Sequence, residues 1–404
     1  MSHGPEFAKV PDHVPADLVK VFDFRNGLGD RPHDVIAKLH EGPRTFYSPV
    51  HHQGEFGVGH WVFTKAEDIR AVFQDSQTFS SKNMTGRAAG VGAPLVPIEY
   101  DAPEHASYRA LMNPIFSPVR MKAMEEKIRQ RAINFIEPLA PRGECDFVVE
   151  FAQRFPAAIF VDLMGLPPEE IPRFLAWEAR MVGSGDVADK RAATQEVVQY
   201  LKDLCKERRQ RPTDDLVTFA VRAELDGRKL SDDEVNGMTF LLFIAGLDTV
   251  ASALSWHMRY LAEHPADQQR LRDEPELVSE AVEELMRAFS TVSSSRWATR
   301  DIEIGGVQVR AGDLVTVSTP CANLDPEEFE NPTLVDFNRT PNRHTAFAYG
   351  PHRCLGSHLA RREMNIAHQE WARLIPTYRI RPGAELTTHG GGVLGLDTLP
   401  LVWR

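Results

Sequence analysis

The sequence is poor in cysteine, has no excess of positive charge and lacks a hydrophobic run long enough to cross a membrane. Its four cysteines, at positions 145, 205, 321 and 354, form no C-x-x-C pair, which disfavours a disulfide framework, a zinc ribbon and a thioredoxin-type redox site. The formal net charge of −11 argues against a dedicated nucleic-acid-binding protein. The N-terminus has no secretory pattern, and the longest apolar run, residues 240–247, is well short of the ~20 residues of a membrane span. We therefore expect a cytoplasmic protein that binds neither nucleic acid nor a membrane.

What is present is the composition of a large globular protein, with 404 residues of which 42% are hydrophobic and 25% charged. The absence of repeats and low-complexity linkers predicts one domain, residues 1–404, that is mainly α-helical with small β-sheets. We divide it into an N-terminal arm (1–40), a β-rich part with a loop (41–100), a helical core (105–290) and a C-terminal part (291–404). Hydrophobic periodicity predicts hairpins over 45–64 and 302–309, loops over 86–97 and 323–342, and helices over 65–74, 120–139, 192–209, 275–289 and 357–374.

A long central helix is expected between these segments. Ser231 and Glu234 have the spacing of a capping box, and the helix that they open can continue to Glu263, before His264-Pro265. Its middle is apolar on nearly every face, which indicates that it is buried.

The stretch Phe-Ala-Tyr-Gly-Pro-His-Arg-Cys-Leu-Gly, residues 347–356, carries the clearest chemical signal. Glycines flank Cys354 and a helix follows it, so unpaired N–H groups at the helix start favour the thiolate, as does the charge of Arg353. Such a thiolate suits an iron ligand. Two other interpretations remain open, a small buried apolar residue and a nucleophilic cysteine with a histidine partner.

This stretch resembles the haem-binding loop of the cytochromes P-450, with Ala348 where that family usually has Gly. Glu284-Leu285-Met286-Arg287 resembles the family's Glu-x-x-Arg ion pair, and Ala245 to Thr249 resembles its oxygen-activation motif. Each of these two patterns alone is common in helices. The three motifs in this order identify a haem-thiolate protein.

The resemblance covers nearly the whole chain and is strongest to the bacterial camphor monooxygenase group, through residues 246–250, 358–363 and 399–403. It implies a single cytochrome P-450 fold, with haem b between the long central helix and the cysteine loop, and Cys354 as the iron ligand. By the same resemblance, His105, Arg109, Arg296 and His352 bind the haem propionates, although each alone could be a surface cation. Ser294 stands where the camphor enzymes have an acid.

The resemblance also implies the reaction, insertion of one atom of O₂ into an unactivated C–H bond while the other atom leaves as water. Thr249 would donate a hydrogen bond to dioxygen and Asp248 would relay protons. Ala245 and Gly246 are small, which would leave room for dioxygen where the helix opens.

The control of Asp248 is expected to differ from that in the camphor enzymes, where basic side chains hold this acid. The matching segment, residues 175–185, contains one basic residue, Arg180. Leu175 and Gly183 occupy the counterpart positions.

The substrate is expected to be a terpenoid or norisoprenoid held mainly by shape. Ala93 stands where the camphor enzymes have a Tyr that binds the substrate, and Tyr100 comes too late in the loop. The candidate lining residues are all apolar, although each alone is more often core: Met84, Leu95, Leu241, Ile244, Ala245, Val292 and Val393.

Electrons must come from another protein, since the chain contains no flavin or ferredoxin segment. We expect an acidic [2Fe–2S] ferredoxin, served by a flavin-dependent reductase, to dock near Arg70, Arg109 and Arg353, and the enzyme to be a monomer. The competing classes are a peroxide-driven haem-thiolate enzyme, which the intact Asp248-Thr249 pair disfavours, and a non-enzymatic haem sensor or carrier. A hydrolase has little support, because neither G-x-S-x-G nor H-E-x-x-H occurs.

Overall fold

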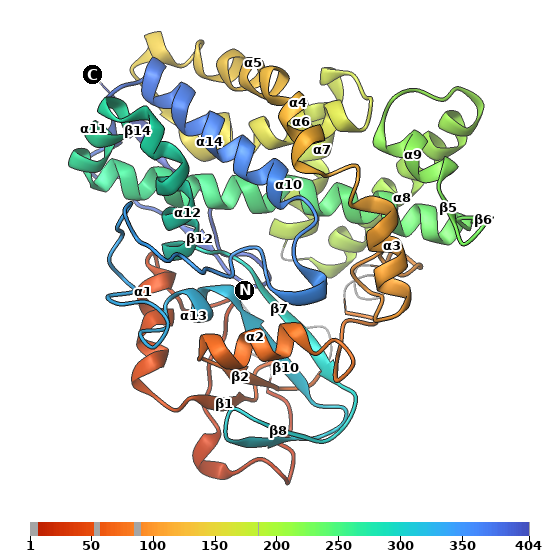
Figure 1. Cartoon of the computed structure of the whole chain (residues 1–404). Coiled ribbons are helices and arrows are strands. Elements are labelled where there is room, and N and C mark those ends of the chain that lie inside the picture. Colours follow the sequence, from red (N-terminus) through yellow and green to blue (C-terminus); the bar gives the residue numbers. More distant parts are fainter. Residues whose placement is uncertain (1–6, 52–56, 85–89, 185, 404) are drawn as a thin grey trace. The chain divides into compact units, whose positions relative to one another are not determined.

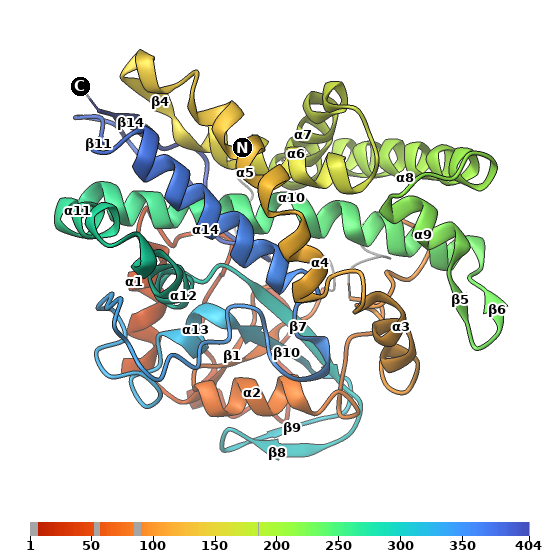
Figure 2. The same ribbon diagram turned by 45° about the horizontal axis from the view of Figure 1, so that its top comes forward.

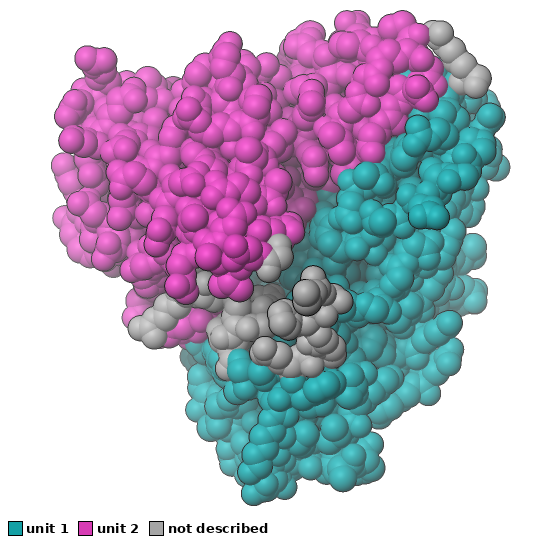
Figure 3. Space-filling view, turned by 180° about the vertical axis from the view of Figure 1, so that it is seen from behind, with its two compact units in different colours: residues 1–80, 252–354, 375–404 teal, residues 81–251, 355–374 magenta. Residues whose placement is uncertain are grey.

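The structure is a computed structural model that describes residues 7–51, 57–84, 90–184 and 186–403 (Figure 1). By its internal contacts the chain divides into two compact units (Figure 3). Unit 1 is Met1–Ser80, Ser252–Cys354 and Ile375–Arg404, and unit 2 is Ser81–Ala251 and Leu355–Leu374. Each unit gathers segments that are far apart in the sequence, and the single-domain organisation stays a prediction.

Unit 1 is built on a mixed five-stranded sheet in the order β1-β2-β10-β7-β3. β1 (Thr45–Ser48) and β2 (His60–Phe63) form the predicted hairpin, β10 (Leu314–Ser318) lies parallel to β2, and β7 (Ser293–Ala298) and β3 (Phe79–Ser80) complete the sheet antiparallel. α2 (Ala66–Gln74) packs on it through the buried side chains of Ile69, Val72 and Phe73, the apolar positions that predicted this helix.

The other elements of unit 1 are short. β8 (Ile302–Ile304) and β9 (Val307–Val309) pair around Gly305-Gly306 as predicted. The remainder are η1 (Ala16–Leu18), α1 (Pro32–Ala37), η2 (Lys38–Glu41), α11 (Pro265–Asp273), η8 (Pro275–Leu277), α12 (Val278–Ala288), α13 (Thr319–Asn323), η9 (Gly350–His352), β11 (Arg379–Ile380), β12 (Thr388–His389), β13 (Gly395–Leu396) and β14 (Pro400–Val402).

Unit 2 is helical and contains most of α10 (Asp232–Glu263). The predicted capping box opens this helix: the Ser231 hydroxyl accepts from the Glu234 N–H at 3.2 Å, and the Glu234 carboxylate accepts from the Ser231 N–H at 2.6 Å. By length and composition α10 could cross a membrane, but most of its apolar stretch is buried inside the protein. It is a core helix.

Two other helices of unit 2 pack against α10. α6 (Arg154–Leu163) and α7 (Ile171–Glu178) lie beside it (Figure 2), since Phe160 and Phe174 contact Phe243 at ring-centroid distances of 6.1 and 5.3 Å. The remaining elements are α3 (Glu104–Met112), α4 (Pro118–Ala123), α5 (Glu125–Ile136), η4 (Ala140–Arg142), β4 (Glu144–Asp146), η5 (Val148–Ala152), η6 (Pro168–Glu170), η7 (Ala179–Gly183), α8 (Val187–Gln210), α9 (Leu216–Arg222), β5 (Glu224–Leu225), β6 (Arg228–Lys229) and α14 (Ser357–Leu374).

Three expectations differ from the structure. The helix predicted over 120–139 is two helices, because the N–H of Met124 bonds three residues back to Met121 and tightens the turn. The helix predicted over 275–289 begins as the 3₁₀ turn η8. α10 does not open at Ala245 and Gly246: it is continuous, and a Cβ at Gly246 would lie 2.8 Å from the Phe160 ring. Gly246 therefore permits close packing. Residues 85–89 of the predicted loop 86–97 lie outside the described residues.

Candidate active site

Cys354 differs from the other three cysteines in its exposure. It is exposed, whereas Cys145, Cys205 and Cys321 are buried. Burial raises the pKa of the Cys145 and Cys321 thiols to about 12 and that of Cys205 to about 11, which keeps these three protonated. Cys354 is therefore the cysteine suited to act as a thiolate ligand.

The backbone around Cys354 is tightly constrained. Gly350 has φ +67° and packs so closely on α2 that a Cβ would lie 2.6 Å from the Phe73 carbonyl oxygen, so only glycine fits there. Ala348 has φ 59°, a left-handed conformation that explains why Gly is usual at this position. The N–H of Cys354 donates to the Phe347 carbonyl at 2.9 Å, which closes the loop.

The Glu284–Arg287 pair on α12 is fully buried, with side-chain exposures of 1% and 0%. Arg287 donates through Nε and Nη2 to the two carboxylate oxygens of Glu284, both at 2.8 Å. Its remaining donors bond the carbonyls of Asn323 at 2.9 Å, Pro332 at 2.7 Å and Leu334 at 3.0 Å. Because the charges are paired and each donor group has an acceptor, the pair is tolerated in the core.

A chain of hydrogen bonds links this ion pair to the cysteine loop. Arg287 holds the backbone of Asn323, whose Oδ1 accepts from the N–H of Thr345 at 2.7 Å and from its hydroxyl at 3.0 Å. The Thr345 carbonyl in turn accepts from the N–H of Ala348 at 2.8 Å. The ion pair thus fixes the loop that carries Cys354.

Two predicted propionate ligands lie near this loop in unit 1. Arg296 on β7 is buried, and its guanidinium lies 5.7 Å from the centre of the Phe73 ring. Phe73 belongs to α2, the helix that Gly350 also contacts. His352 is half-buried in η9. The structure thus brings both residues together with the Cys354 loop around α2.

In unit 2, the predicted haem and oxygen-activation residues lie on two helices, α3 and α10. Buried His105 and half-buried Arg109 share one face of α3. On α10, Ala245 is exposed and Thr249, four residues later, places its Oγ1 3.5 Å from the Ala245 carbonyl, a weak hydrogen bond. A hydroxyl held so weakly can turn to donate elsewhere.

The predicted substrate residues also fall into two sets. In unit 1, Val292 and Val393 pair through an isolated antiparallel bridge. In unit 2, Leu241 lies four residues before Ala245 on α10. Leu241, Ile244 and Met84 are half-buried, whereas Leu95 is fully buried in the hydrophobic core.

The Tyr100 side chain contacts a neighbouring tyrosine. It packs against Tyr108 with the ring centroids 4.8 Å apart and shares a hydrogen bond with it, and burial raises the pKa of Tyr100. Tyr108 in turn donates to Glu234 at the start of α10.

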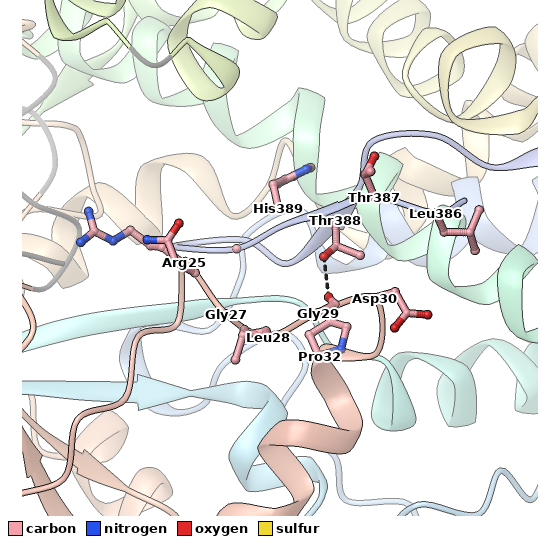
Figure 4. Close-up of a pocket in the computed structure, with 12 residues that line it drawn as sticks. Arg25, Gly27, Leu28, Gly29, Asp30, Pro32, Leu386, Thr387, Thr388 and His389 are labelled. Carbon is pink, nitrogen blue, oxygen red and sulfur yellow. Dashed lines mark hydrogen bonds between the residues drawn. The ribbon is translucent and has the colours of Figure 1, made fainter. Parts of the chain in front are cut away.

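A hollow of about 370 Å³ lies in unit 1 between residues 25–32 and residues 386–390 (Figure 4). The Thr388 hydroxyl bridges its two sides by donating to the Gly29 carbonyl at 2.7 Å. Its lining contains none of the predicted haem or substrate residues.

Among the predicted docking residues, Arg70 is already paired. It donates to Glu328 at 2.7 Å and to the Arg343 carbonyl at 2.8 Å, which reduces the charge that it can offer to a partner. Arg353 is exposed.

Sequence reasoning missed one residue at this site, Glu178 at the end of α7. Burial, together with the charge of Asp248, raises the pKa of Glu178 to about 8. The signal in the sequence was an acid one helical turn after Phe174, on the apolar side of an amphipathic helix.

The residues described above fit a haem. Exposed Cys354 lies in a loop that packs on α2 through Gly350, where only glycine fits. Buried Arg296 lies beside the same helix, over the Phe73 ring. A thiolate suits iron, and a buried cation suits a propionate.

Comparison with known proteins gives the same answer. A family model described as Cytochrome P450 matches residues 179–373. The chain is 41% identical over 403 residues to the probable cytochrome P450 127A1 of Sinorhizobium fredii (strain NBRC 101917 / NGR234), covering 98% of this chain and 97% of that protein. It is 31% identical to a steroid C26-monooxygenase of Rhodococcus jostii (strain RHA1), covering 92% of this chain and 82% of that protein. The crystal structure of cytochrome P450 CYP101C1 is similar with a TM-score of 0.89 and 34% identity, covering 98% of this chain and all of that chain.

This chain belongs to the cytochrome P450 family. It is a P450 monooxygenase that binds haem b and a lipophilic substrate, and it uses O₂ with electrons from a redox partner. The resemblance to the camphor monooxygenase group agrees with its structural similarity to CYP101C1.

Proposed function

We propose that this protein is a cytoplasmic, monomeric monooxygenase that hydroxylates a small terpenoid or norisoprenoid with electrons from a [2Fe–2S] ferredoxin and its flavin-dependent reductase. The observation that carries the substrate proposal is the composition of the predicted pocket. Each proposed lining residue is apolar, and the Tyr100 hydroxyl shares a hydrogen bond with Tyr108. A site of this kind selects a compact apolar molecule by shape.

In this proposal, haem b supplies the redox chemistry that activates O₂. Cys354 holds the iron, and four residues bind the propionates: Arg296, His352, His105 and Arg109. The overall reaction converts a C–H bond and O₂, with two electrons and two protons, into an alcohol and water.

The side chains of α10 would control the protons in this reaction. The Thr249 hydroxyl is weakly held by its own helix, at 3.5 Å, and can donate a hydrogen bond to dioxygen. Asp248 supplies a carboxylate next to it in the sequence that can pass protons inward.

The test is a titration of the purified holoprotein with monoterpenoids, norisoprenoids, a steroid and a macrolide, followed by the haem absorption spectrum. A low- to high-spin shift with a terpenoid or norisoprenoid, and an oxygenated product of that compound with ferredoxin, reductase and O₂, is the expected result. A shift with the steroid alone would move the substrate to the class named for the Rhodococcus relative.

Two controls separate the competing classes. Product formed with peroxide but not with ferredoxin would indicate a peroxide-driven enzyme, and haem binding without product from either source would indicate a sensor or carrier. Val292→Phe, which fills space at the predicted pocket, should weaken the substrate-induced shift, whereas Val149→Phe, at an exposed position, should leave it unchanged.

A further inference from the structure

Residues 95–100 form a compact turn in unit 2 that begins at one of the proposed substrate residues. The Leu95 N–H donates to the Glu99 carboxylate at 2.9 Å, and the Glu99 N–H donates to the Leu95 carbonyl at 2.9 Å. Leu95 and Glu99 are both buried, and the Tyr100 N–H donates to the Pro97 carbonyl at 3.1 Å. Because these bonds close the turn on itself, the position of Tyr100 determines that of Leu95.

The chain at the start of this turn lies directly on α10. A Cβ at Gly237 would overlap the Pro94 carbonyl oxygen, so glycine at this position permits the contact. Leu241 and Ala245, two other proposed substrate residues, follow Gly237 by four and eight positions and therefore share its side of the helix. A shift of Leu95 would change the space along that side.

Four polar side chains connect the turn to the start of α10. The Tyr100 ring packs on that of Tyr108 with the centroids 4.8 Å apart, and the two side chains share a hydrogen bond. The hydroxyl of buried Tyr108 donates to the Glu234 carboxylate. Arg228 on β6 donates to both oxygens of that carboxylate, at 2.8 and 2.7 Å. We call these four residues the tyrosine latch.

The charge of Glu234 strengthens the latch. Hydrogen bonds from Arg228 hold the pKa of Glu234 well below its usual range, so this carboxylate is ionised at neutral pH. A hydrogen bond to an ionised acceptor is roughly twice as strong as one between neutral groups. Loss of the Tyr108 hydroxyl would also remove a donor from a buried carboxylate.

We propose that Tyr108 is a positioning residue for substrate selection: through the tyrosine latch it holds the turn at residues 95–100 on α10 and so fixes one wall of the substrate pocket. A wall that is already ordered favours a compact molecule, because no binding energy is lost in ordering it. The inference rests on the proposed function, since it takes Leu95, Leu241 and Ala245 as lining residues.

The first test is amide hydrogen exchange of the holoprotein without substrate. Tyr108→Phe keeps the ring but removes the hydroxyl, and it should speed exchange of the Leu95 and Glu99 amides roughly tenfold. Unchanged exchange of this turn would refute the latch. Tyr260→Phe is the matched control: it removes a hydroxyl that donates to Asp267 at 2.6 Å in unit 1, and the turn should keep its protection.

A second control separates the latch from the helix cap, because Glu234 takes part in both. Ser231→Ala removes the hydroxyl that accepts from the Glu234 N–H and leaves Tyr108 in place. This variant should loosen the first turn of α10 but not residues 95–100. Equal loosening of residues 95–100 in Ser231→Ala and Tyr108→Phe would mean that the cap, and not the latch, holds them.

The second test compares two probes that bind haem iron through nitrogen, imidazole and the larger phenylimidazole. Tyr108→Phe should raise the dissociation constant of phenylimidazole roughly three- to tenfold, because the loosened wall must be ordered again, and leave that of imidazole unchanged. With the substrate found above, KM should rise by a similar factor while kcat stays within about twofold. Equal binding of phenylimidazole by both proteins would refute the role in selection.

The outcomes separate the two proposals. If wild type forms no oxygenated product from any donor, the proposed function fails, and amide exchange with phenylimidazole binding still decides whether the latch orders a pocket wall. If wild type turns over and Tyr108→Phe keeps wild-type exchange, phenylimidazole binding and KM, the latch is refuted and the function stands.

Discussion

The substitution Glu178→Gln should change how the stability of this protein depends on pH. Burial and Asp248 raise the pKa of Glu178 from 4.5 to about 8, so the folded protein binds this proton more tightly than the unfolded chain does. The folded state therefore loses stability as pH rises between these two values, by at most about 1.4 kcal/mol per pH unit. Below the lower value both states hold the proton, so the stabilisation by this group is fully present and no longer changes with pH.

From pH 6 to pH 8, wild type should lose about 2 kcal/mol of unfolding free energy relative to Glu178→Gln. The assay is urea unfolding of both holoproteins at pH 6, 7 and 8, followed by circular dichroism. Because the two proteins share all other titrating groups, the contributions of those groups that do not interact with Glu178 cancel in the difference. A constant difference across this range would mean that Glu178 is already ionised at pH 6. Glu170→Gln, which replaces a carboxylate of the same region that accepts from Arg173, is the matched control.

Four further substitutions test the packing described above. Arg287→Met removes one partner of a buried ion pair and should lower the unfolding free energy by about 3–5 kcal/mol, so a loss below 1 kcal/mol by urea unfolding would contradict the assigned bonds. Ala348→Gly relieves a left-handed backbone and should stabilise by about 0.5–1 kcal/mol, whereas a lower melting temperature would speak against that strain. Gly246→Ala should destabilise by about 1–3 kcal/mol because its Cβ meets Phe160, and unchanged thermal unfolding would disprove this contact. Ser231→Ala should lose about 1 kcal/mol from the helix cap, and equal amide-exchange protection of that turn in both proteins would count against it.

Much of the fold could be predicted because it is encoded locally. The hairpin at Gly305-Gly306 and the capping box of Ser231 depend on residues a few positions apart. The helix predicted over 357–374 has those bounds in the structure. Local spacing and turn chemistry are what a single sequence displays.

Other features depend on residues that are distant in the sequence. The hydrogen bonds between Asn323 and Thr345 join residues 22 positions apart, and the hydrophobic periodicity of the sequence does not predict them. Glu178 and Asp248 lie on different helices, so their electrostatic coupling required the packing of α7 on α10. The break at Met124 also has no marker, since neither glycine nor proline stands there.

The hydrogen bonds that two arginines make to the main chain of the loop over residues 323–342 have a consequence for protein engineering. Arg287 and Arg339 bond its main-chain carbonyls, those of Pro332 and Leu334 in the first case and of Glu330 and Leu334 in the second. Main-chain acceptors are the same for every amino acid, so exposed side chains here can be exchanged for labels or surface charges. An inserted or deleted residue would move the carbonyls themselves. This loop should therefore tolerate substitution of its exposed side chains but not a change of its length.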